Sequence, residues 1–298
     1  MTYHIPVLLN ESVDGLNINP EGIYVDVTFG GGGHSREILR RLKTGRLIAF
    51  DQDEDAERNV IEDERFLFIG QNFRYLKNNL KYLGIQSIDG LIADLGVSSH
   101  HLDIPERGFS FSHGGKLDMR MNSMASLTAG EVVQSYSEKE LVQLFSSYGE
   151  IRNSKRLAHV IVESRSEKPI ESIQDFIQTI GSCIPGKFQN KYLAQVFQAL
   201  RIEVNKELDC LRDLLMQCIE FIRGNGRLVT ITYHSLEDRM VKNFMRSGNF
   251  KGLVEKDFYG NVKVPFVPVN KKVIVAGKDE IQKNSRARSA KLRIARKM

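Results

Sequence analysis

The sequence predicts an α/β protein with a mostly parallel, doubly wound, Rossmann-like sheet into which a helical domain is inserted. Short apolar segments alternate with helical ones along the first third of the chain, and four consecutive glycines follow the first of them. The alternation then stops for about a hundred residues and resumes near the end. Strands and helices joined by short connections favour parallel strands with right-handed crossovers. The predicted domains are residues 1–104 with 206–298 for the sheet, and 105–205 for the insertion.

The first unit carries the clearest pattern. Ile23 to Val27 is β-branched and aromatic and has the length of a buried strand, and Gly30 to Gly33 follow it. Ser35 is predicted to cap the next helix. A second apolar strand, 47–50, ends on Asp51. A strand, a glycine turn, a helix and a strand ending on an acid indicate a nucleotide-type cofactor site, with the acid placed to bind ribose hydroxyls.

The glycine turn discriminates between cofactors. Gly30 and Gly32 fit a dinucleotide fingerprint, but Ser35 stands at its third position, and the sequence has no P-loop pattern. No basic side chain before Arg36 could hold a pyrophosphate. An adenosyl cofactor without phosphate, S-adenosylmethionine (SAM), therefore fits better, with Asp26 placed to interact with its cationic amino-acid part. The alternative, a turn with no ligand, is disfavoured by the acid that ends the second strand.

The remaining elements follow from hydrophobic periodicity. In the first third we expect a helix over 53–61 and strands over 66–69 and 88–95, with a strand-to-helix turn at Asn72-Phe73. Residues 105–205 show helical spacing without a convincing strand, and Ser137 to Glu140 is a capping box. The last third predicts a helix over 206–223, a strand over 226–233, a helix over 236–245 and a final strand over 289–295.

Composition bounds the class of protein. The chain has 298 residues, of which 41% are hydrophobic and 27% charged, as in a globular protein in water. No apolar run reaches the ~18 residues of a membrane span, and no secretory signal is visible. Three cysteines without C-x-x-C spacing and seven histidines without an H-x-x-x-H pair predict neither disulfides nor a metal site. We therefore expect a cytoplasmic protein without a metal.

Positive charge is concentrated at the end of the chain. The net charge is +5, and residues 270–298 contain ten Lys or Arg and two Asp or Glu, a balance of +8 that leaves −3 for the rest. Such a segment suits contact with a phosphate backbone. A solvated, flexible tail explains the charge equally well.

The carboxyl ends of the strands are where an open α/β sheet binds its ligands. Asp94 closes a strand there, and a buried acid favours function because an unpaired carboxylate is costly to bury. Phe73 either stacks on an adenine ring or packs in the core. His34 either donates a hydrogen bond to the cofactor or caps the turn, and His234 is more simply a structural histidine.

Nine motifs resemble the RsmH (MraW) family, and they follow in order through nearly the whole chain. They are His4–Glu11, Asp26–Ser35, Asp94–Ser99, Glu106–Phe111, Leu117–Met121, Tyr148–Glu150, Phe197–Ile202, His234–Arg239 and Arg286–Arg293. The resemblance implies a class I SAM-dependent methyltransferase with a helical domain inserted after the fourth strand. It also implies methylation of N4 of a cytidine in the decoding region of 16S ribosomal RNA.

The resemblance assigns site residues. The cofactor contacts of the family correspond to Gly32, Gly33, His34, Asp51, Phe73 and Asp94, and His101 stands where the family has a glutamine. Imidazole also donates or accepts a hydrogen bond. We expect Asp94 to be catalytic as well, as the acceptor that helps the cytosine amine become pyramidal and later takes its proton.

RNA contacts are expected from aromatic and basic residues. The stacking candidates are Phe109, Phe111 and Tyr233, and the phosphate candidates are Arg107, Arg120, Arg201, Arg239, Arg286, Arg288 and Lys291. For each, a core aromatic or a surface ion pair is an equally good interpretation. The expected partner is 16S rRNA or the small ribosomal subunit, with no membrane, and a homodimer is left open. The rival hypotheses are a non-catalytic assembly factor with a vestigial SAM pocket, and a SAM methyltransferase acting on DNA or protein.

Overall fold

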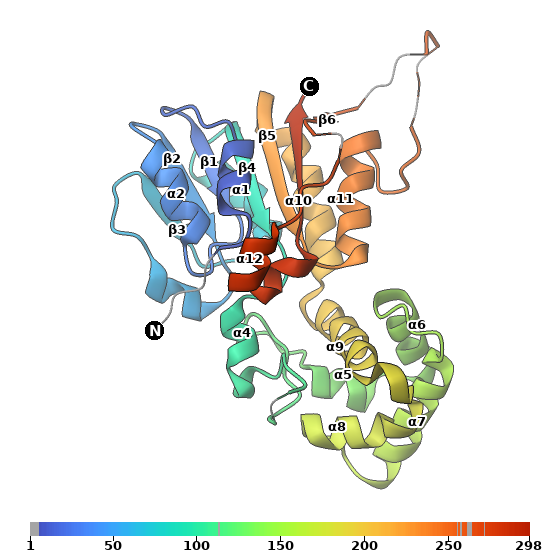
Figure 1. Ribbon diagram of the computed structural model, residues 1–298. Helices are drawn as coiled ribbons and strands as arrows, with labels where there is room; N and C mark the ends of the chain where they lie inside the picture. Colours follow the sequence, from blue (N-terminus) through green and yellow to red (C-terminus); the bar gives the residue numbers. More distant parts are fainter. Residues whose placement is uncertain (1–5, 113, 255, 257, 261–263, 271) are drawn as a thin grey trace. The chain divides into compact units, whose positions relative to one another are not determined.

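The computed structural model describes residues 6–112, 114–254, 256, 258–260, 264–270 and 272–298. The chain divides into two compact units (Figure 1). We call Met1–Gly96 with Leu208–Met298 the sheet unit, and Val97–Glu207 the helical unit. His4 and Ile5, which open the first family-like motif, lie outside the described residues.

One sheet forms the centre of the sheet unit, and its order in the described part of the chain is β3-β2-β1-β4-β5-β7-β6. The strands are β1 Ile23–Asp26, β2 Arg46–Phe50, β3 Phe66–Ile69, β4 Ile88–Asp94, β5 Ile222–Thr232, β6 Phe266–Pro268 and β7 Lys291–Lys297. Strands β1 to β5 are parallel, and β7 runs antiparallel to β5 and β6. This confirms the predicted mostly parallel α/β sheet. The strand order reverses between β1 and β4, and the crevice outside such a reversal is where open sheets bind ligands.

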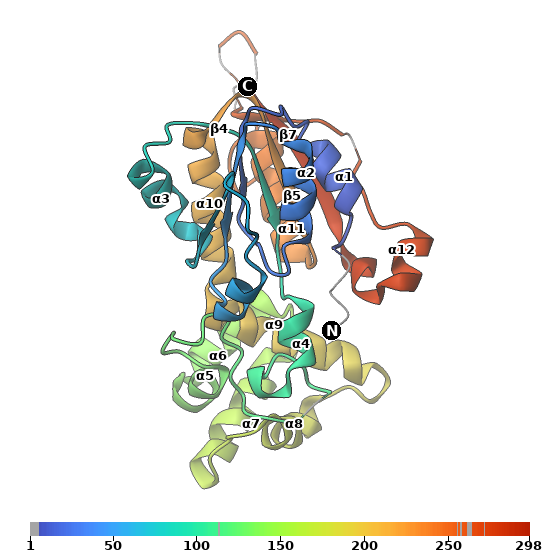
Figure 2. The same cartoon turned by 90° about the vertical axis from the view of Figure 1, so that its left-hand side faces the viewer.

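Helices cover both faces of this sheet (Figures 1 and 2). They are α1 Leu9–Gly15, α2 Gly33–Arg41, α3 Leu76–Tyr82, α10 Glu207–Phe221, α11 Ser235–Ser247 and α12 Lys278–Lys283. Ile38 and Leu39 of α2 share a core with Leu47 of β2 on one face. On the other, Leu215 of α10 and Phe244 of α11 pack in a second core. Burying each such side chain stabilises the fold by about 1.5–3 kcal/mol.

Two local predictions were wrong, and the predicted final strand is confirmed with a shift of two residues. Helix α2 begins at Gly33 with Gly32 as its N-cap, so Ser35 lies inside the helix and donates to the Asp26 carboxylate instead. The expected helix over 53–61 is a shorter 3-10 helix, Glu54–Asn59. The final strand extends to Lys297, and the sequence did not predict the three-residue strand β6 beside it. Strand β6 ends on Pro268, which suits a sheet edge because proline lacks the N–H that would donate to a neighbouring strand.

The helical unit has a core of its own. Its helices are α4 Ser99–Asp103, α5 Ala129–Ser135, α6 Glu138–Tyr148, α7 Ser154–Glu167, α8 Ile173–Ile180 and α9 Gln189–Asn205. Phe145, Phe176 and Val196 are fully buried in it. The predicted capping box of Ser137 and Glu140 is confirmed at the start of α6; such caps contribute about 1 kcal/mol each.

The three cysteines, Cys183, Cys210 and Cys218, are free and buried. Across the described ranges, none of the helices combines the length and the apolar character that crossing a membrane requires.

Candidate active site

The glycine turn joins β1 to α2 at the carboxyl edge of the sheet. Gly30 and Gly32 have φ angles of +49° and +73°, in the left-handed region that favours glycine. A Cβ on Gly32 would lie 2.6 Å from an Arg36 nitrogen and 3.0 Å from the Phe29 ring, and one on Gly33 would lie 2.7 Å from Pro6. A Cβ on Gly30 would meet open space. The backbone at Gly30 is therefore open to a ligand, while the glycines after it are closely packed.

The buried Asp26 side chain stabilises this turn through hydrogen bonds. Its side chain is 1% exposed. The Ser35 hydroxyl donates to Oδ2 at 2.7 Å, and the Thr28 amide donates to Oδ1 at 3.1 Å. Burial raises the pKa of Asp26, and these hydrogen bonds oppose the shift. The structure therefore gives Asp26 a role in shaping the turn, and its contact with the cofactor's amino-acid part stays a prediction.

Asp51 directly follows β2 and is tied to the same turn. The amide of Gly30 donates to its Oδ2 at 2.8 Å, and the amide of Asp53 donates to its Oδ1 at 2.9 Å. A carboxylate oxygen accepts more than one hydrogen bond, so this arrangement is compatible with a ribose contact. Phe73 begins the 3-10 helix after β3, where it is half-buried and packs one side against the core.

Asp94 ends β4 and receives contacts from the two neighbouring strands. Its amide donates to Thr28 Oγ1 at 2.7 Å, and the Tyr233 hydroxyl donates to its Oδ1 at 2.8 Å. His34 Nδ1 lies 3.9 Å from Oδ2. Burial raises the pKa of Asp94 to about 6, against the opposing effects of His34 and Tyr233. Asp94 is thus a fixed acceptor whose charge changes near neutral pH.

His34 contributes a second acceptor. Its Nε2 lies 3.2 Å from the carbonyl oxygen of Val7. A carbonyl only accepts hydrogen bonds, so Nε2 carries the proton and the neutral ring leaves Nδ1 as an acceptor. Burial lowers the pKa of His34, and the Asp94 carboxylate opposes this only in part. His34 Nδ1 and Asp94 Oδ2 are thus two acceptors that face each other at this edge of the sheet, 3.9 Å apart.

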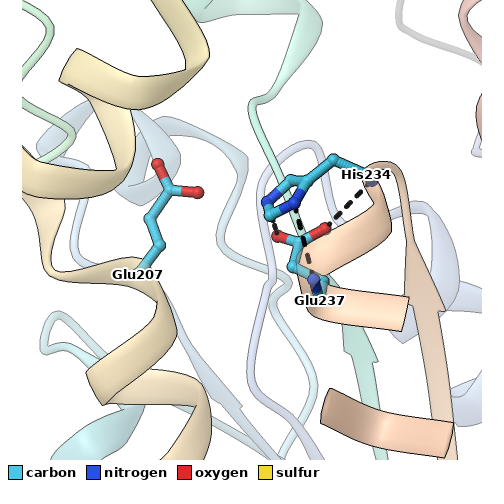
Figure 3. Close-up of side chains that lie close together, drawn as sticks. All are labelled: Glu207, His234 and Glu237. Atoms are coloured by element: carbon cyan, nitrogen blue, oxygen red, sulfur yellow. Dashed lines mark hydrogen bonds and ion pairs between the residues drawn. The ribbon is translucent and has the colours of Figure 1, made fainter. Parts of the chain in front are cut away.

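Tyr233 is positioned by the start of α11, where His234 and Glu237 form a capping box (Figure 3). His234 is the N-cap of this helix, and its Nε2 lies 3.1 Å from Glu237 Oε1. The amides of Tyr233 and His234 both donate to Glu237 Oε2, at 3.1 and 3.4 Å. This capping box fixes the corner after β5 and so the Tyr233 side chain beside Asp94. Glu207, also drawn, belongs to the helical unit and pairs there with Arg201.

The aromatic candidates of the helical unit lie in or against its core. His101 is 5% exposed and stacks on Phe109, with 4.7 Å between the ring centroids. Phe109 is itself buried. Phe111 is partly buried and packs edge-on against Phe197, at 5.6 Å. For these residues the structure favours the packing interpretation in the conformation described here.

Most basic candidates have protein partners. Arg107 donates to the backbone oxygens of Arg120 and Met121, and Arg201 makes a bidentate pair with Glu207. Of the other candidates, Arg120 pairs with Asp118 and Lys291 lies 3.4 Å from Asp238. Arg286 is half-buried, and Arg239 and Arg288 are exposed.

The structure thus brings one group of predicted residues together at the ends of β1, β4 and β5: Gly32, Gly33, His34, Asp94 and Tyr233. Asp51 and Phe73 lie at the adjoining strand ends. Sequence reasoning missed the bond from Tyr233 to Asp94. The available signal was that both residues follow apolar strands, but strand order is needed to make them neighbours.

The sequence was also compared with those of known proteins and families. The model of the MraW methylase family matches residues 1–298. A relative from Phocaeicola vulgatus is 58% identical over 99% of this chain and 97% of its own length. One from Bacteroides thetaiotaomicron is 57% identical over 100% and 98%, and one from Flavobacterium johnsoniae 53% identical over 100% and 99%. All three are named ribosomal RNA small subunit methyltransferase H.

The predicted resemblance, enzyme class and cofactor are therefore confirmed: the chain belongs to the MraW methylase family of SAM-dependent methyltransferases.

Proposed function

We propose that this protein methylates N4 of a cytidine in the decoding region of 16S rRNA, either as free RNA or in the small ribosomal subunit. The names of its relatives support small-subunit rRNA as the substrate. The observation that carries the proposal is Asp94, a fixed acceptor at the end of β4. An exocyclic amine needs an acceptor of this kind. The three buried thiols suit the reducing cytoplasm, where we place the reaction.

Gly32, Gly33, His34, Asp51, Phe73 and Asp94 would hold the cofactor, and the family resemblance adds His101, which in this structure stacks on Phe109. SAM supplies a methyl group on a sulfonium that is already a good leaving group. The protein therefore acts mainly by positioning. Asp51 orients the glycine backbone through Gly30, and the packed glycines after it keep the turn in place.

The chemical task of the chain is to prepare the amine. The lone pair of a cytosine N4 is delocalised into the ring, so the amine is a weak nucleophile. Asp94 Oδ2 would accept a hydrogen bond from this amine, which favours the pyramidal geometry, and would take the proton that the product releases. The Tyr233 hydroxyl holds the other oxygen, Oδ1, at 2.8 Å and so orients the carboxylate. Such proton transfer contributes typically 10²–10⁴ in rate.

The target base must leave its stack to reach the reacting methyl group. We propose the helical unit as the substrate-recognition domain. The exposed Arg239 and Arg288, with Arg286 and Lys291 of the basic tail, would contact the RNA backbone. A homodimer would be tested by the mass of the protein in solution.

The decisive experiment is mass spectrometry of small-subunit RNA from cells with and without this protein. One methyl group on a decoding-region cytidine should be lost in its absence and restored by the wild-type gene. In parallel, Asp94→Asn should lower kcat about 100-fold or more. An unchanged methylation pattern would favour a non-catalytic assembly factor, and methylation of a DNA duplex at a comparable rate would favour the DNA methyltransferase.

A further inference from the structure

A small basic cavity lies in the sheet unit, between the second half of α11 and strands β6 and β7. In Figure 1, α11 and β6 appear beside the end of the sheet that carries the C-terminus. The cavity has a volume of about 120 Å³. It is lined by Lys242, Met245, Arg246, Pro268, Asn270, Arg293 and Ile294.

One face of α11 supplies most of its charge. Asp238, Lys242 and Arg246 follow one another at intervals of four residues, so they lie on the same side of the helix. Phe244 lies on the opposite side, and both Phe244 and the adjacent Val241 are fully buried. Packing of the apolar side therefore fixes the direction in which the basic side chains emerge.

The cavity has more positive than negative charge. Arg293 makes a bidentate pair with Asp238, at 2.7 and 3.2 Å, which accounts for one cation. Arg246 donates to the backbone oxygen of Gly252 at 3.3 Å. Within the described ranges, neither Lys242 nor Arg246 has a carboxylate partner. Two formal positive charges remain, and they outweigh the roughly half negative charge at the carboxyl end of a helix.

Basic side chains connect this cavity with the active-site edge. Lys291 and Arg293 are two residues apart on β7, so their side chains point to the same face of the sheet. Both contact Asp238. Lys291 pairs with Thr232 at the end of β5. A series of cations thus runs from that end along β7 and α11 to the cavity. Lys242 and Arg246 lie about 10 to 16 Å along the helix from Ser235, at 1.5 Å per residue.

We propose that this cavity binds a backbone phosphate of the RNA substrate, at a nucleotide other than the one that is methylated. A lysine ammonium, an arginine fork and the Asn270 amide are donors that suit phosphate oxygens. The inference rests on the proposed rRNA substrate and adds an anchoring site to it. A contact remote from the reacting base binds the ground state and the transition state alike, so it lowers KM without changing kcat.

The test uses the full-length protein with Lys242 and Arg246 both changed to glutamine. Both side chains are exposed, so the fold should persist, and the thermal midpoint checks this. The matched control changes Lys43 and Arg46 to glutamine. These are also one exposed lysine and one exposed arginine, but they lie at or just before the start of β2, which four strands separate from β6 in the sheet. Both variants lose the same net charge.

Affinity for a decoding-region RNA fragment is measured from 50 to 300 mM salt. The cavity variant should bind RNA about tenfold more weakly than wild type. The slope of the logarithm of its association constant against the logarithm of the salt concentration should be less negative by about 0.7 to 0.9, which corresponds to the loss of one phosphate contact. Its KM for RNA should rise with kcat unchanged, and the control should match wild type within twofold. An unchanged slope, or an equal loss in the control, would overturn the proposal. So would inorganic phosphate binding with no change in RNA affinity.

Binding and methylation are read separately, so the two proposals fail separately. A shallower salt slope without any rRNA methylation would refute the proposed function and retain the RNA contact. Normal methylation with an unchanged slope would refute the contact alone.

Discussion

The Tyr233 hydroxyl donates to Oδ1 of Asp94 at 2.8 Å and joins the ends of two adjacent parallel strands. Burial, and then the Asp94 carboxylate, raise the pKa of Tyr233, so the phenol keeps its proton and remains the donor. The Tyr233 ring also packs where Gly96 has a φ of +109° and a Cβ would lie 3.1 Å away. The orientation of the Asp94 carboxylate is thus determined by a side chain from another strand.

Changing Tyr233 to phenylalanine should alter the pH profile of the enzyme. The ring is retained and only the hydroxyl is lost, so packing should survive. The hydrogen bond lowers the pKa of Asp94, and hydrogen bonds to charged groups contribute about 1.5–3 kcal/mol. The acid limb of kcat/KM for SAM should therefore move up by about one pH unit. A profile that coincides with wild type, whatever the loss in rate, would exclude this positioning role.

In the wild type, activity should require the ionised form of Asp94. With a pKa of about 6, kcat/KM for SAM, which reports the cofactor-free enzyme, should reach half its maximum near pH 6. It should fall about tenfold per unit below that. In Asp94→Asn this limb should disappear along with most of the activity. Measuring kcat/KM for SAM between pH 5 and 8.5 tests this. If the asparagine variant still lost activity below pH 6, the loss would come from a group other than Asp94.

The same carboxyl should reduce the stability of the free protein at neutral pH. Because the pKa of folded Asp94 lies above its ordinary value of 3.8, the folded state binds more protons between about pH 4 and 6, and stability falls as pH rises through this window. The Asp94→Asn variant has no carboxylate charge to bury, and its amide oxygen can still accept the hydrogen bond from Tyr233. The side chain is 22% exposed, so solvent screens part of the effect, and we expect a gain of about 1–2 kcal/mol at pH 7.

Urea unfolding at pH 4, 6 and 7.5 measures this difference. The gain should vanish at pH 4 and stay level above pH 7. Asp26 also has a raised pKa and is present in both proteins, so the part of its contribution that does not depend on Asp94 cancels. An asparagine variant less stable than wild type at pH 7.5 would show that the carboxylate is well accommodated when charged.

Much of this architecture was predictable from local pattern. Strand β3 was predicted at its observed bounds, and β4 to within a residue, because apolar runs of strand length bounded by polar turns have few alternatives. Asp94 at the end of β4 followed from the same pattern. Ser137 and Glu140 predicted the start of α6, since a capping box involves residues only three apart.

The rest depends on contacts between distant segments. Ser35 fits the composition of an N-cap, yet a glycine with positive φ precedes it and the Asp26 carboxylate accepts its hydroxyl hydrogen bond. Arg201 fits a phosphate contact until its pairing with Glu207 is known. Strand β6 is too short for periodicity to reveal, and it forms only because β7 offers an edge. Hydrogen bonds and ion pairs of this kind are determined by tertiary structure.

Alanine substitutions at Gly32 and Gly30 should affect the stability of the fold and the binding of SAM to different extents. Gly32 and Gly30 both have positive φ, so alanine costs of order 1 kcal/mol at either. At Gly32 the new Cβ also meets the Phe29 ring at 3.0 Å, whereas at Gly30 it enters open space. We expect Gly32→Ala to lower the free energy of unfolding by about 2–3 kcal/mol. Gly30→Ala should cost about half as much.

Among the molecules that remain folded, Gly30→Ala should lower the affinity for SAM more than Gly32→Ala does. The methyl group of Gly30→Ala occupies the space through which a ligand approaches the backbone, so we expect its affinity for SAM to fall at least tenfold. Calorimetric titration of both variants, well below their thermal midpoints, measures this. If Gly30→Ala bound SAM as tightly as wild type, the open space beside Gly30 would not belong to the cofactor site, and the approach to the turn would have to be sought on the side of Asp94 and His34.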